Sequence, residues 1–157
     1  MAGDSAQSDD EGNIFQIADK KVWRQGDFVF GCADDPRYAQ LIRHAFDPPP
    51  LPKVRTIEAL ERYFTVEFAP ELRKTFRSDT ELKAEDKHPD LEMIVGVRGC
   101  IFEVYGTFSW ARPLDGFAAV GSGHLPARAV MSVLPNLHPR NRLKKALEAA
   151  CKFTTSC

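Results

Sequence analysis

The chain has 157 residues, of which 43% are hydrophobic and 27% are charged, and its formal net charge is −1. This length and composition predict a single domain spanning residues 1–157, with a core of two or more layers. The near-neutral charge gives no electrostatic case for binding nucleic acid or an anionic membrane, and no apolar run approaches the roughly 20 residues that span a bilayer.

Cysteine and histidine usage adds two expectations. The four cysteines have no C-x-x-C spacing, which favours free thiols and a cytoplasmic location over disulfides or zinc. Cys32, Cys100 and Cys151 stand among apolar neighbours, so we expect them to be buried. The four histidines have no metal-ligand spacing, and we therefore expect no metal.

The first part of the chain predicts strands followed by helices. Apolar residues favour a strand at 14–22 and a buried strand at 28–32, joined by a hairpin turn at 25–27. Asp35-Pro36 then supplies an N-cap and a first-turn proline for a helix. Thr56 caps a second helix, in which apolar residues recur at spacings of three and four.

The second part of the chain repeats this order. Alternating apolar residues over 91–97 and 100–106 predict two strands joined by a hairpin turn, and a further short strand is expected within 108–112. The last helix starts at Pro139 and carries a clear apolar stripe. The order of strands, two helices, strands and two helices predicts a sheet sandwich with helices on both outer faces.

The centre of this pattern is a small-residue corner. Phe117–Val120 suits a buried strand, Gly121-Ser122-Gly123 is a tight exit from it, and helical spacing starts at Leu125. Such a corner sets backbone N–H groups and a hydroxyl beside the positive end of a helix, where an anion or a reaction centre can be held. The same residues also suit a glycine turn that only lets a helix pack close to a sheet.

Three segments, in their order along the chain, resemble the proteasome β-type or HslV-like family of N-terminal nucleophile hydrolases. They are Ala2-Gly3-Asp4-Ser5, then Lys20-Lys21-Val22 followed by 28–33, and finally Ala119-Val120-Gly121-Ser122-Gly123 with its small-residue helix. The final helix, at 143–154, also resembles the family's closing helix. Together these segments cover most of the chain, and 48–90 matches only as helices in the expected place.

The resemblance implies an α+β fold with four layers, α-β-β-α, and the activity of a threonine-type peptidase subunit. In this family the first residue of the mature chain attacks the peptide carbonyl, and its own α-amine is the general base. By resemblance, Lys21 takes the lysine role, Asp4 the aspartate role, and Ser122 a place in the supporting network. The resemblance also implies substrate-lining residues at Gly31, Cys32, Ala33, Asp34, Gly121 and Gly123.

The same resemblance implies partners but no cofactor. We expect a homo-oligomer of stacked rings that enclose the active sites, a peptide or protein substrate, and an ATP-dependent unfoldase as a partner. Without the family, Asp4 suits an Asx-type turn and Lys21 suits a solvated surface lysine. His124 directly follows the corner and is placed to touch a ligand.

The chain departs from the family pattern in three places. The nucleophile that should head a first strand is missing, and a last strand is expected to be lacking after Cys157. Met1 has no proton to lose from its thioether, and Ser5 has no adjacent α-amine, so we expect the chain as it stands to be inactive. Asp34 and Asp35 replace small residues, which opposes developing negative charge and favours basic substrate residues.

Three explanations remain open. The first is that Met1 is an internal methionine of a longer, active peptidase headed by Thr, Ser or Cys. The second is a natural non-catalytic member of the family, acting in assembly or in ligand or protein binding. The third is an unrelated α+β ligand-binding domain. Upstream codons for an apolar strand headed by Thr, Ser or Cys would favour the first explanation over the second.

Overall fold

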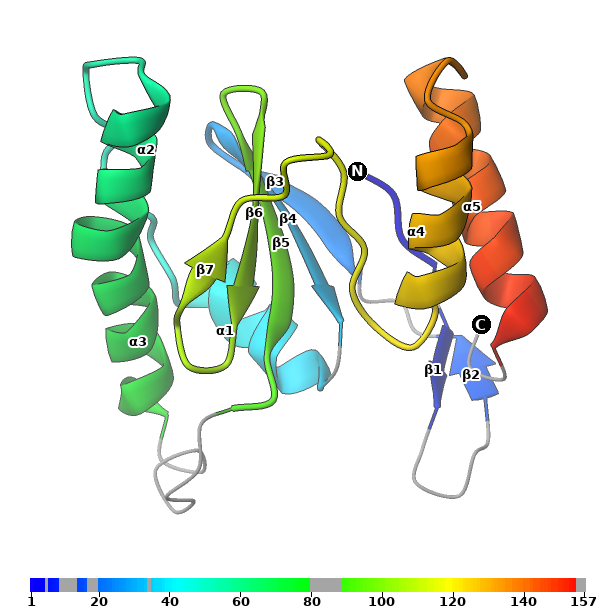
Figure 1. Ribbon diagram of the computed structural model, residues 1–157. Helices are drawn as coiled ribbons and strands as arrows, with labels where there is room; N and C mark the ends of the chain where they lie inside the picture. Colours follow the sequence, from blue (N-terminus) through cyan, green and yellow to red (C-terminus); the bar gives the residue numbers. More distant parts are fainter. Residues whose placement is uncertain (5, 9–13, 17–19, 34, 80–88, 155–157) are drawn as a thin grey trace.

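The fold is built around one antiparallel sheet of five strands, in the order β3-β4-β5-β6-β7. The computed structural model describes residues 1–4, 6–8, 14–16, 20–33, 35–79 and 89–154. Helices cover both sides of the sheet (Figure 1). The strands are β3 (Val22–Gln25), β4 (Phe28–Ala33), β5 (Glu92–Val97), β6 (Cys100–Tyr105) and β7 (Trp110–Ala111).

Two tight turns set the register of this sheet. Gly26 in the β3–β4 turn has φ +58°, and Arg98 and Gly99 in the β5–β6 turn have φ of +50° and +78°. Two-residue turns with positive φ match the right-handed twist of the strands that they join. Both predicted hairpins are confirmed. The pairing places Gly31 opposite Val22 on one side and opposite Ile94 on the other.

Three helical segments follow β4 and cover what we call the front face of the sheet. They are α1 (Pro36–His44), α2 (Ile57–Tyr63) and α3 (Ala69–Ser78), with a π-helical turn, η1 (Phe64–Phe68), between the last two. As predicted, Asp35 caps α1 and Thr56 caps α2 through their side-chain oxygens. Pro70 does not break the helix. The π-helical turn before it is wider than an α-helical turn, and in it the Ala69 N–H donates to the Phe64 carbonyl, five residues back.

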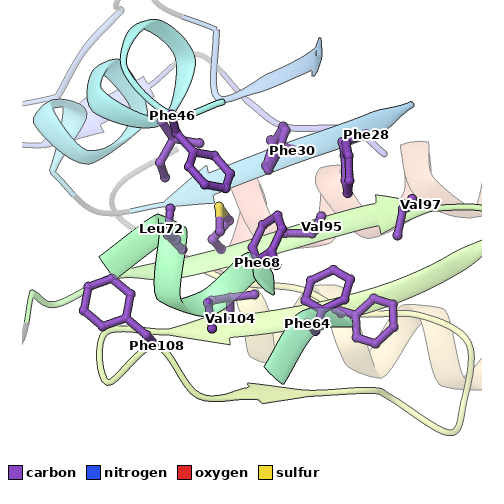
Figure 2. Packing of buried hydrophobic residues seen from close by; sticks show 14 of the residues in the cluster. Phe28, Phe30, Phe46, Phe64, Phe68, Leu72, Val95, Val97, Val104 and Phe108 are labelled. Atoms are coloured by element: carbon purple, nitrogen blue, oxygen red, sulfur yellow. The ribbon is translucent and has the colours of Figure 1, made fainter. Parts of the chain in front are cut away.

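The main hydrophobic core lies between the front face and these helices (Figure 2). Phe30, Phe64 and Phe68 are fully buried in it. The ring of Phe64 stacks on that of Phe102 with centroids 3.9 Å apart. Aromatic pairs add stabilisation beyond the area that they bury, so this layer contributes strongly to the stability of the fold.

The opposite side of the sheet, which we call the back face, carries different elements. The helices α4 (His124–Val133) and α5 (Pro139–Phe153) lie on this side, together with the N-terminal segment and a hairpin of two short strands (Figure 1). These strands, β1 (Ala6–Ser8) and β2 (Ile14–Gln16), pair antiparallel. The chain therefore has the predicted α-β-β-α arrangement.

Three sequence predictions are wrong in detail. The expected single strand at 14–22 is wrong, since β2 and β3 belong to different sheets and Lys20 and Lys21 lie outside both strands. Phe117–Val120 is irregular rather than a strand: Phe117 is buried against α4 and α5, but burial alone does not supply a pairing partner. Of the cysteines expected to be buried, only Cys32 is; Cys100 is partly exposed, and Cys151 is exposed because Ala146 and Ala150 form the buried side of α5.

Candidate functional site

The clearest polar contact among the predicted site residues joins Lys21 to Asp4. The Lys21 ammonium Nζ lies 2.8 Å from Asp4 Oδ1, and the two side chains are 28% and 30% exposed. The residues are 17 positions apart in the chain, so the fold and not local sequence brings them together. The pair predicted by family resemblance is thus in direct contact.

The chain around this pair packs against the strand β4. The Lys21 carbonyl accepts a hydrogen bond from the Cys32 N–H at 3.0 Å, just before β3 begins. A Cβ built on Gly3 would lie 3.1 Å from Val22 Cγ2, which shows how closely the N-terminal segment crosses β3. Only glycine allows this approach without displacing Val22.

The small-residue corner reaches the same end of β4 from the other side. Gly121 has φ +87°, a left-handed conformation, and a Cβ built on it would lie 3.0 Å from Ala33 Cβ. Lys21 contacts Cys32 and Gly121 contacts Ala33, so both predicted parts of the site meet neighbouring residues of β4. Ser122 is exposed on the loop that leads into α4.

The helix behind the corner is held by small side chains. A Cβ built on Gly123 would lie 2.7 Å from Ala150 Cβ on α5, which leaves no room for a side chain. Ala127, Met131, Ala146 and Ala150 form a second, smaller core between α4 and α5. The small residues of the corner therefore do serve close packing, as the simpler interpretation of the sequence expects.

Several backbone groups of the corner already form hydrogen bonds within the protein. The Gly121 N–H donates to Glu92 Oε2 at 3.1 Å, and the His124 N–H donates to the Gly121 carbonyl at 3.0 Å. His124 Nδ1 also lies 2.8 Å from that carbonyl oxygen. Pro126 has no N–H to offer. These contacts narrow the set of backbone donors that α4 presents to an anion.

The predicted substrate loop is a strand for most of its length. Gly31, Cys32 and Ala33 are the last residues of β4, and the Cys32 N–H is used by the Lys21 carbonyl. This N–H is therefore not available to an oxyanion, contrary to what a loop would allow. Asp34 lies outside the described residues. The Asp35 carboxylate accepts the Arg37 N–H at 2.7 Å as the cap of α1.

Sequence reasoning missed the acidic groups on the back face. Glu92 on β5 and Glu103 on β6 point toward α4, and Arg128 Nη1 lies 3.3 Å from Glu103 Oε1. Their positions follow from strand alternation, because Met93 and Phe102 beside them face the main core. The sequence did carry a signal for them: each is a glutamate next to an apolar core residue in a predicted strand, so alternation places it on the opposite face.

Within the described ranges, no group of three or more His, Cys, Asp or Glu side chains is arranged to hold a metal ion. Likewise, none of the helices in the described part of the chain is long and apolar enough to cross a bilayer.

Comparison of the fold with solved structures finds three informative similarities. HslV from Trypanosoma brucei has a TM-score of 0.69 and 23% identity, covering 99% of this chain and 86% of that one. BPH from Thiobacillus denitrificans has a TM-score of 0.75 and 18% identity, covering 98% and 84%. Anbu from Pseudomonas aeruginosa has a TM-score of 0.61 and 14% identity, covering 99% and 71%.

These similarities rest on the fold. No family model matches the sequence, and no curated protein matches it either. The matched structures nevertheless share the layered arrangement over nearly the whole of this chain. The chain therefore has the proteasome-type fold of the N-terminal nucleophile hydrolases, similar to that of HslV.

Proposed function

We propose that this chain is a proteasome-like peptidase subunit whose supporting residues are Asp4, Lys21 and Ser122. One observation carries the proposal: the Lys21–Asp4 ion pair and the Gly121–Gly123 corner meet the same end of β4. Nothing in the packing of the main core requires a lysine at this position, since Lys21 lies outside that core.

The proposed chemistry is attack by an N-terminal hydroxyl or thiol on a peptide carbonyl. The free α-amine of that residue takes the proton from its own side chain. The Lys21 ammonium beside the amine favours its neutral, basic form, and Asp4 fixes the orientation of the ammonium. We assign Ser122, on the neighbouring corner, to the supporting network of this reaction.

The nucleophile is the part that the proposal still requires. Met1 contacts the middle of the sheet, where its Sδ would be 2.6 Å from a Cβ built on Gly31. A thioether cannot attack a carbonyl in this way. The proposed mechanism therefore requires a Thr, Ser or Cys with a free α-amine beside Lys21.

The proposed substrate is a peptide or protein with basic residues. The carboxylates of Asp35, at the start of α1, and Glu92, beside Gly121, lie near the end of β4. Their negative charge would favour a substrate with basic residues. We also propose a homo-oligomer, since the Pseudomonas aeruginosa relative forms a helical assembly. An ATP-dependent unfoldase remains a proposed partner.

The mass of the N-terminal peptide of the native protein, purified from its source, tests this proposal. We expect a mature chain that starts with Thr, Ser or Cys. A native chain that starts at Met1 or Ala2 would overturn the catalytic proposal. It would leave the alternative of a non-catalytic member that uses the same fold for assembly or binding.

A further inference from the structure

Two carboxylates on the back face connect the sheet to the element that carries Ser122. Glu92 and Glu103 come from neighbouring strands, and the register places Glu92 opposite Tyr105 and Glu103 opposite Ile94. Both therefore lie on the face that looks toward α4. Neither residue belongs to the set that the family resemblance implies.

Glu92 holds the start of the corner. Its Oε2 accepts the Gly121 N–H at 3.1 Å, across 29 residues of sequence. Gly121 has φ +87°, and it packs against Ala33 at the end of β4. A side-chain acceptor at this point fixes the direction in which the chain enters α4. The position of Ser122 follows directly from that direction.

Glu103 holds the first turns of α4. Its side chain is only 8% exposed, with Oε1 3.3 Å from Arg128 Nη1 on α4 and Oε2 accepting the Tyr105 hydroxyl at 2.9 Å. Burial and this hydrogen bond raise the pKa of Tyr105. Oε1 forms no hydrogen bond of good geometry, so the guanidinium is its main compensation.

We propose that Glu92 and Glu103 are positioning residues for the Ser122 corner, through the Gly121 N–H and the Arg128 guanidinium. Together they hold the turn before α4, at Gly121, and the helix itself, at Arg128. The value of this positioning for catalysis rests on the proposed function. The positioning itself is a property of the fold, and it can be tested without an activity assay.

The test compares amide hydrogen exchange in Glu92→Ala, Glu92→Gln and the unsubstituted chain. In Glu92→Ala, we expect the Gly121 amide to exchange at least about fivefold faster, because it loses its acceptor. In Glu92→Gln, the amide oxygen still accepts, so protection should largely return. The amides of Val95 and Phe102, in the core strands, serve as the internal reference and should not change.

A matched control is Glu148→Ala, since Glu148 lies exposed on α5 in a surface pair with Lys144. We expect it to leave the Gly121 amide unchanged. If Gly121 exchange is unaltered in Glu92→Ala, or if Val95 and Phe102 accelerate equally, the positioning role is overturned. If the native N-terminus lacks a nucleophile while the exchange results hold, the proposed function fails and the positioning stands.

Discussion

The two faces of the five-stranded sheet differ in the side chains that cover them. Along β4, Phe28, Phe30 and Cys32 point to the front face and are buried under α1, α2 and α3. Gly31 and Ala33 alternate with them on the back face. The front face is filled by interlocking aromatic rings (Figure 2), whereas the back face meets glycines, small residues and charges.

This difference shows how one strand can serve both stability and a site. Side chains of successive strand residues point to opposite faces, so β4 can be rigid on one side and closely approached by other segments on the other. The N-terminal segment that carries Asp4 meets this second side at Gly31, and the Gly121 corner meets it at Ala33. Substitutions on the two faces should therefore have separable effects on stability and chemistry.

The largest effect on stability is expected from Phe64→Ala on the front side. The ring of Phe64 is fully buried and stacks on Phe102, so the substitution leaves a cavity. We expect a loss of about 3–5 kcal/mol in the free energy of unfolding, measured in urea. Lys21→Ala, on the back side, should cost about 1 kcal/mol or less because the ion pair is partly exposed. Equal losses would contradict the division between the faces.

A smaller effect is expected from Arg128→Met on the back face. It leaves the buried Glu103 carboxylate without its cationic partner, which should cost about 2 kcal/mol in urea unfolding. Adding Glu103→Gln should recover most of that loss, because a neutral amide needs no counter-ion. A double variant as unstable as Arg128→Met alone would show that the charge pair is not the cause.

A still smaller effect, dependent on pH, is expected from Tyr63→Phe. The Tyr63 hydroxyl donates to the Pro49 carbonyl, and losing this bond should cost about 1 kcal/mol at neutral pH. Burial, followed by the charge of Glu67, raises the pKa of Tyr63 above its ordinary value of 10.0. The folded chain therefore keeps a proton that the unfolded chain releases near pH 10, and stability falls above that pH.

Thermal unfolding between pH 8 and pH 11 measures this effect. The unsubstituted protein should lose stability above about pH 10, and Tyr63→Phe should lose less over the same interval. Some decline should remain, because the pKa of Tyr105 is also raised. Identical pH profiles for the two proteins would show that Tyr63 does not titrate differently in the folded and unfolded chains.

Local chemistry made much of the fold predictable. Asp35-Pro36 and Thr56 marked the starts of α1 and α2, and Arg98-Gly99 marked the β5–β6 turn. Strand alternation predicted the front face of β5 and β6. These features depend on neighbours within a few residues, which a sequence displays directly.

What the sequence did not reveal depends on distant partners. Phe117–Val120 has the composition of a strand, but the Gly121 N–H that follows it bonds to the Glu92 carboxylate instead of a ladder. The Lys21–Asp4 contact was expected only by family resemblance, since no spacing rule connects residues that far apart. The roles of Glu92 and Glu103 likewise needed the sheet register.

Peptide hydrolysis by the native protein tests the central claim most directly. With a fluorogenic peptide that carries a basic residue, we expect Lys21→Ala to lower the rate at least about 100-fold, because the α-amine loses its neighbouring ammonium. Lys20→Ala, at the adjacent exposed lysine, should keep the rate of the unsubstituted protein. Equal hydrolysis by Lys21→Ala and Lys20→Ala would contradict the account.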